Sequence, residues 1–263
     1  MRMTLAFVLI STLGTQTARA QTADRAQLLK ANAQALSAQR AGEFDVAESH
    51  WRFALRLAAQ LRPEQRDPAD EAVLHGNMAA LYAEQQEFSQ AWVECERALA
   101  FHRTADLLNG AGIILQGLDR LPEAEAAYEE ALRQLRPGTL AAARTRFNLA
   151  TLWARQGRRA EALSEMEAQL PLLEADPLTH ATALWHASVL TRPERARAML
   201  LRAQERIDQA GAGNVYLRRM ILEARAERET EKRMARKLRA EANRLRTPPK
   251  AGVSVEQLRR EGY

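Results

Sequence analysis

The stretch Asn148–Met166, NLATLWARQGRRAEALSEM, decides the fold of this 263-residue chain. Its apolar residues recur every three or four positions on both sides of a short polar turn, residues 156–159, as two amphipathic helices joined by a turn require. The stretch Asn77–Cys95, NMAALYAEQQEFSQAWVEC, repeats the same pattern. The sequence therefore predicts a repeated helix–turn–helix unit.

Small residues recur at fixed places in four copies of this unit. One alanine lies in the first helix, and a second follows 12 or 13 residues later: Ala35 and Ala47, Ala79 and Ala91, Ala111 and Ala124, and Ala150 and Ala162. Two helices cross closely only where side chains are small. An isolated pair leaves its apolar face exposed, whereas stacked pairs bury a continuous core, so we expect a solenoid with a concave side.

The two quoted stretches resemble tetratricopeptide repeats, and the resemblance covers about residues 28–176. Successive second alanines are 44, 33 and 38 residues apart, which is similar to the kinesin-light-chain-like subclass. The resemblance implies an all-α fold, a right-handed superhelical solenoid of about four to five antiparallel helix pairs. Residues 178–209 form the degenerate fifth pair in this interpretation.

Four segments are expected along the chain. Residues 1–20 have the layout of a cleavable signal peptide, with Arg2, a ten-residue apolar run and the A-x-A site at residues 18–20. This layout predicts a periplasmic or extracellular protein that is soluble after cleavage; the alternative is an uncleaved N-terminal anchor. The solenoid follows over residues 21–210. Residues 211–246 are expected to form a long basic helix that caps it, and residues 247–263 a flexible tail.

Catalytic chemistry is not indicated by any motif. No two of the five histidines have the three- or four-residue spacing that places two metal ligands on one helix face, and Cys95 is the only cysteine. We therefore expect no enzyme, no metal, no cofactor and no small-molecule substrate. Nucleic acid is an unlikely partner, because no aromatic residues interleave the basic ones to stack on bases.

The resemblance implies that the first helix of each pair lines a concave groove that binds a protein or peptide. Asn77, Asn109 and Asn148 each precede the first alanine of their copy by two residues. Their amides could hold a peptide backbone or, alternatively, only stabilise the inner surface. In the third copy Gly112 could be the contact residue in place of Ala111, which would rotate Asn109 by about 100°. The other groove candidates are Arg40, Glu84, Gln116, Arg144 and Arg155.

Charge is unevenly distributed along the chain. Residues 21–214 hold 22 basic and 26 acidic residues, whereas residues 215–250 hold 12 basic and 5 acidic ones. The alternative to a groove-binding scaffold is therefore an electrostatic tether, whose C-terminal helix binds an anionic membrane or cell-wall surface. The residues proposed for this role are Arg225, Arg228, Lys232, Arg233, Arg236, Lys237 and Arg239. A solvated, self-paired capping helix is the competing interpretation.

Overall fold

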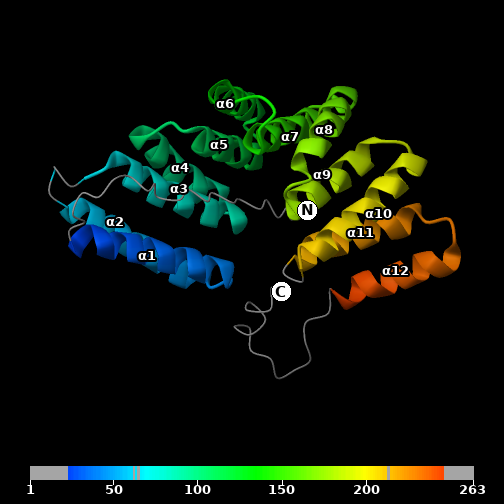
Figure 1. The fold of residues 1–263 in the computed structure, drawn as a ribbon, viewed down its shortest axis with the longest axis horizontal. Coiled ribbons are helices and arrows are strands. Elements are labelled where there is room, and N and C mark those ends of the chain that lie inside the picture. The colour runs from blue at the N-terminus through cyan, green and yellow to red at the C-terminus, as the bar shows by residue number, and fades with distance from the viewer. Residues whose placement is uncertain (1–22, 62, 64–65, 212–213, 246–263) are drawn as a thin grey trace. The chain divides into compact units, whose positions relative to one another are not determined.

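The computed structural model describes residues 23–61, 63, 66–211 and 214–245 (Figure 1). Within these residues the chain forms twelve α-helices and no strand, which confirms the all-helical fold class. The helices are α1 (Ala23–Arg40), α2 (Phe44–Gln60), α3 (Pro68–Glu84), α4 (Phe88–Phe101), α5 (Ala105–Gly117), α6 (Leu121–Gln134), α7 (Leu140–Arg155), α8 (Arg159–Leu173), α9 (Pro177–Leu190), α10 (Pro193–Gln209), α11 (Val215–Arg228) and α12 (Lys232–Arg244). The expected signal peptide, residues 1–20, and tail, residues 247–263, lie outside the described residues.

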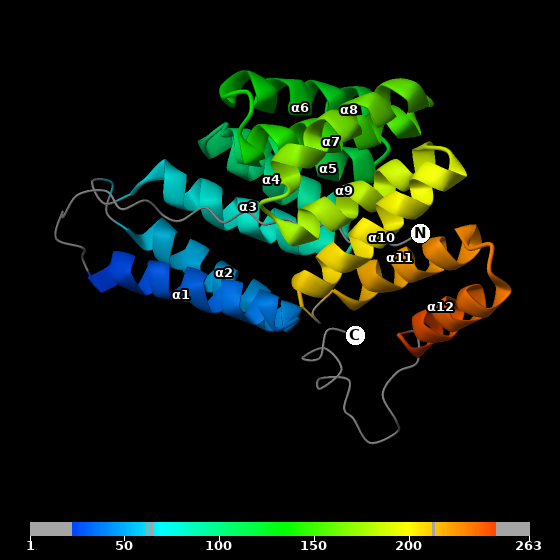
Figure 2. The same cartoon turned by 45° about the vertical axis from the view of Figure 1, so that its right-hand side comes forward.

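Consecutive helices pack as pairs, as the ribbon shows for α9–α10 and α11–α12 (Figure 2). The chain divides into two compact units. Unit 1 ends at Gln134 and contains the pairs α1–α2, α3–α4 and α5–α6. Unit 2 begins at Leu135 and contains α7–α8, α9–α10 and α11–α12. The described residues thus form six pairs, more than the four to five expected.

The first four pairs share one turn. A residue with positive φ stands between the two helices in each of them: Gly42, Gln86, Asp119 and Gly157. The next residue donates its N–H to a carbonyl five residues earlier, over 2.8 to 2.9 Å. This left-handed helix end satisfies carbonyls that the finished helix leaves open. The recurrence of one turn explains why the sequence repeats so visibly in these four pairs.

The turn also fixes the register of the third repeat. The positive-φ residue follows Ala35, Ala79 and Ala150 by seven positions in their pairs, and in the third pair the same step leads back from Asp119 to Gly112. A Cβ on Gly112 would lie 2.4 Å from the ring of Tyr128, so this glycine is where α5 and α6 touch. The contact residue is therefore Gly112 and not Ala111, and the spacing to Ala124 becomes 12 residues, as in the other copies.

Each unit has its own apolar core. The second alanine of every repeat is fully buried, and the residue four positions later is buried beside it: Trp51, Cys95, Tyr128 and Met166. One hydrophobic cluster joins α1 to α5 in unit 1, with Leu28, Leu74 and Ile114 among its members. A separate cluster joins α7 to α11 in unit 2 around Leu184 and Ile207. Burial of such side chains is the main stabilising contribution to a helical solenoid.

The expected single helix over residues 211–246 is divided in two. Helix α11 ends at Arg228 and α12 begins at Lys232, so the segment forms a sixth pair (Figure 1). The carboxylate of Glu229 accepts the N–H of Glu231 at 3.0 Å, which closes the turn. Folding back buries Leu222 and Ala226 against Leu238 and Ala242. A single straight helix would leave these apolar side chains in water, so their burial outweighs the hydrogen bonds lost at the break.

Candidate functional site

The amide of Asn77 lies inside unit 1 and not on its surface. Asn77 is 4% exposed, and its Nδ2 donates to Oδ1 of Asn32 at 3.1 Å. The same oxygen accepts the indole N–H of Trp51 at 2.9 Å. Since both amides and the indole are buried, the network satisfies polar groups of α1, α2 and α3 on one another. Asn77 is therefore a packing residue, and its expected role in a groove is corrected here.

Gln116 is also buried. It is 4% exposed, and its Oε1 accepts the hydroxyl of Tyr128 at 3.2 Å. Tyr128 is fully buried and needs a partner for its hydroxyl group. Gln116 supplies that partner and is unsuited to hold a ligand.

Two other candidates of unit 1 lie at the ends of first helices. Arg40 is the last residue of α1 and is exposed. Glu84 is the last residue of α3, and its carboxylate accepts the amide N–H of Gln39 at 2.9 Å. The C-terminal ends of α1 and α3 therefore meet at a polar, water-accessible edge. Asn109 is half-buried on α5, in the register set by Gly112, so it does not occupy the place of Asn77 in its repeat.

The remaining candidates belong to unit 2. Asn148 is half-buried on α7, and Arg155 is exposed at the end of that helix. Arg144 instead pairs with Asp176 at 2.5 Å, which joins the second turn of α7 to the residue that caps the start of α9. Burial raises the pKa of Asp176, but hydrogen bonds from Thr179 and from Arg144 outweigh it and leave the pKa below its usual value. Arg144 thus stabilises a helix start by holding its capping carboxylate ionised.

An aromatic cluster on the first helices of unit 2, α7 and α9, was not predicted from the sequence. Phe147 of α7 meets the ring of His186 edge-on at 5.6 Å, and Trp185 meets the same ring at 4.7 Å. Burial lowers the pKa of His186 to about 4, so its ring is neutral at neutral pH. The only signal in the sequence is that Trp185 and His186 are adjacent within an apolar helix. This signal does not identify the contact with Phe147.

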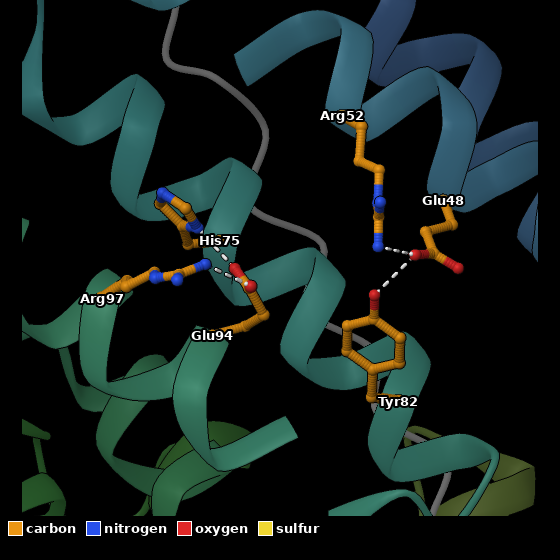
Figure 3. Close-up of polar contacts among 6 residues, drawn as sticks. All are labelled: Glu48, Arg52, His75, Tyr82, Glu94 and Arg97. Atoms are coloured by element: carbon orange, nitrogen blue, oxygen red, sulfur yellow. Dashed lines mark hydrogen bonds and ion pairs between the residues drawn. The ribbon is translucent and has the colours of Figure 1, made fainter. Parts of the chain in front are cut away.

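Two polar clusters in unit 1 were also not anticipated (Figure 3). The carboxylate of Glu94 on α4 lies between the ring of His75, at 2.6 Å, and the guanidinium of Arg97, at 2.7 Å. The contact with His75 connects α4 to α3, whereas Arg97 lies on α4 itself. Because a buried carboxylate is costly without partners, Glu94 is stabilised by having both.

The second cluster connects α2 to α3. Glu48 accepts the hydroxyl of Tyr82 at 2.7 Å and pairs with Arg52 at 2.6 Å (Figure 3). Burial raises the pKa of Tyr82, with a further contribution from its hydrogen bond to Glu48. The hydroxyl therefore remains a neutral donor at any physiological pH, which suits a structural contact.

The basic residues expected in the C-terminal segment fall into two groups. Arg225 and Arg228 lie half-buried on α11, where Arg228 donates to the carbonyl of Ala224 at 3.2 Å. The other five are exposed on α12: Lys232, Arg233, Arg236, Lys237 and Arg239. Arg244, which was not among the residues predicted for this role, is exposed on the same helix.

No group of three or more histidine, cysteine or carboxylate side chains within the described ranges could hold a metal ion. The thiol of Cys95 is buried between helices, and this burial raises its pKa to about 12. A protonated, enclosed thiol is a poor nucleophile. In the part of the chain that the structure describes, no helix is both long and apolar enough to cross a bilayer.

Solved structures with a similar fold were found, although no protein-family model matches the chain and no curated protein shows significant sequence similarity to it. PilF of Pseudomonas aeruginosa aligns with a TM-score of 0.59 and 20% identity, over 90% of this chain and 97% of its own. PilW, described as a widely conserved type IV pilus biogenesis factor, gives 0.58 and 20%, over 88% and 96%. BtubC from P. vanneervenii gives 0.51 and 19%, over 89% and 98%. At these identities the likeness defines the fold: the chain is an all-helical repeat protein built, like tetratricopeptide-repeat proteins, from consecutive helix pairs.

Proposed function

We propose that this chain is an exported, non-enzymatic scaffold that binds a protein or peptide through the first helices of its repeats. The observation that carries the proposal is the fold, six helix pairs whose relatives in structure include a type IV pilus biogenesis factor. Helix-pair repeats stack into extended surfaces suited to holding a partner chain. The 44-, 33- and 38-residue spacing of the four shared turns supports the kinesin-light-chain-like subclass as part of this proposal.

The contact surface that we propose consists of the candidates that remain at the surface of each unit. They are Arg40, Glu84 and Asn109 in unit 1, and Asn148 and Arg155 in unit 2. Arg144 contributes indirectly by fixing the start of α9 through Asp176. In the aromatic cluster, the half-buried ring of Trp185 on the first helix α9 offers apolar area for a partner side chain.

Site-specific photo-crosslinking tests the surface. A photoreactive residue is placed at Arg155, at the end of a first helix, or at Ser164, exposed on the second helix α8. We expect one defined partner to be captured from Arg155 and not from Ser164. Arg155→Glu should weaken the capture of that partner about tenfold, since a charged hydrogen bond contributes about 1.5–3 kcal/mol. Equal capture from both positions would exclude the first-helix surface.

Export is tested separately. Alanines at positions 18 and 20 fit the small pockets that a signal peptidase recognises, so the mature chain should begin at Gln21. Intact mass spectrometry of exported protein measures this. A membrane-bound product that retains Met1 would favour the uncleaved anchor.

A further inference from the structure

Helix α12 presents one continuous basic face. Its 13 residues include six basic side chains and one acidic one, Glu241, all exposed. At about 100° per residue the six bases fall within an arc of about 160°. Ala235, Leu238 and Ala242, which pack against α11, occupy the opposite side. The basic face therefore points away from the seam of the pair. We call it the α12 basic face: Lys232, Arg233, Arg236, Lys237, Arg239 and Arg244.

The α12 basic face is not neutralised within the described chain. None of the ion pairs given for the described residues involves its six side chains. Two exposed arginines of unit 2 outside α12 do have such partners: Arg195 pairs with Glu167, and Arg202 pairs with Glu174. Beyond α12, residues 247–263 carry three basic and two acidic residues, and residues 1–22 carry two arginines and no acid. Neither end of the chain thus has surplus negative charge to place on this face.

The break at residues 229–231 determines which side of α12 is exposed. Because α12 folds back on α11, its apolar side is covered by Leu222 and Ala226. The helix therefore has no free apolar stripe with which to insert into a membrane, and only charge is offered to a partner. Arg197 of α10 donates to the carbonyl of Arg228 and holds the end of α11 in place. The α12 basic face therefore belongs to a packed helix pair and not to an isolated helix.

We propose that the α12 basic face docks the protein on the surface of an anionic phospholipid bilayer. Charge complementarity selects the occupant: clusters of four to eight basic residues along a helix are attracted to acidic lipid headgroups, each contributing about 1 kcal/mol near the surface. The face is about 20 Å long and presents its charges over a broad arc, which matches a plane of headgroups. It contains no aromatic side chain on which a nucleic-acid base could stack.

Vesicle partitioning tests the proposal with matched variants of the full chain. Arg233, Arg236 and Lys237 are replaced together by Gln, which removes three charges opposite the α11 seam. The control replaces Lys30, Arg133 and Arg136 by Gln, which removes the same charge from exposed positions outside α12. The readout is the ratio of partition coefficients on phosphatidylglycerol-containing and pure phosphatidylcholine vesicles. This ratio cancels any apolar contribution that residues 1–20 make to both.

We expect a large ratio for the parent chain that falls steeply between about 0.05 and 0.3 M salt, as screening requires. The α12 variant should lower the ratio on the order of 100-fold, and the control less than about threefold. A parent ratio near one, or equal losses in both variants, would overturn the proposal. Tighter binding to poly-glutamate than to the anionic vesicles at equal salt would assign the face to an acidic protein instead. Circular dichroism confirms that both variants keep their helices; if the first variant does not fold, Lys232→Gln with Arg239→Gln replaces it.

Discussion

Asn32 is the single acceptor on which two buried donors of unit 1 depend. Its Oδ1 receives the indole N–H of Trp51 and the amide N–H of Asn77. An unsatisfied buried donor costs about 1–3 kcal/mol. The position of Asn77 along its helix predicted contact with a ligand, because position alone does not show which buried groups need a partner. Asn32 lies one residue before the equivalent place in the first repeat, so the repeat pattern did not predict that it accepts the amide N–H of Asn77.

The substitution Asn32→Ala should therefore destabilise the protein more than Asn77→Ala does. The first leaves two donors without an acceptor, and the second removes only one hydrogen bond, so we expect losses of about 2–4 and about 1 kcal/mol in the free energy of unfolding. Urea denaturation measures both. Because the two residues share a bond, the double variant should lose less than the sum. Equal losses in the single variants would show that Trp51 finds another partner.

His186 should make the stability of unit 2 depend on pH. Its pKa is about 4 in the folded chain and about 6.5 when exposed, so the unfolded state binds the proton more readily. The stabilising contribution is complete above pH 6.5 and is lost as the pH falls towards 4. We expect a loss of about 1–3 kcal/mol across this range.

Thermal denaturation between pH 7 and pH 5 measures the effect of His186, since most carboxylates stay ionised there. His186→Gln cannot take up the proton and should flatten the decline in melting temperature. His102→Gln, at the exposed end of α4, is the control and should leave the slope unchanged. A decline that persists in His186→Gln would assign the pH dependence to another group.

Most elements could be predicted because the same local chemistry recurs in them. Helices α3, α5, α7 and α9 begin where Asp67, Thr104, Thr139 and Asp176 cap the free N–H groups, and the positive-φ turn ends the first helix of four pairs. The break before α12 carries neither glycine nor proline. It depends on the side chain of Glu229 and on contacts between residues 16 positions apart in sequence, which local patterns do not reveal.

Helix α12 should be the element most sensitive to a single core substitution. Its apolar contact with the chain is limited to the small cluster that Leu238 shares with Leu222 and Ala226. Leu238→Ala should lower the free energy of unfolding by about 2–5 kcal/mol. This loss exceeds the stabilisation that so small a cluster gives to α12. We expect the amides of α12 to exchange with solvent as fast as an unfolded segment, while α9 and α10 keep their protection.

Hydrogen exchange followed by mass spectrometry resolves this region of the chain. Met234→Ala is the matched control, because Met234 is 38% exposed on the same helix. It should leave the protection of α12 nearly unchanged. If Leu238→Ala also preserved that protection, the pair α11–α12 would be held together by contacts other than its apolar seam.

At the scale of the chain, two of the apolar clusters among the described residues each lie within one unit. The cluster around Leu74 draws only on unit 1, and the cluster around Leu184 draws only on unit 2. In a repeat protein each pair is stabilised by its neighbours. The loss of stability caused by a substitution is therefore largest in the substituted pair and decreases with distance along the chain. Candidate contact residues occur in both units, and a partner that needs both would be sensitive to either core.

Matched substitutions in the two cores should therefore have separate effects. Leu74 and Leu184 are 1% and 0% exposed, so Leu74→Ala and Leu184→Ala should cost similar amounts, about 2–5 kcal/mol. We expect Leu74→Ala to accelerate hydrogen exchange mainly in α1–α6 and Leu184→Ala mainly in α7–α12, with the difference measured peptide by peptide. The largest acceleration should surround the substituted helix, α3 or α9, because nearest-neighbour stabilisation is lost there first. Uniform acceleration over both units in either variant would mean that the twelve helices open as a single cooperative structure, and the division into two cores would then have no energetic meaning.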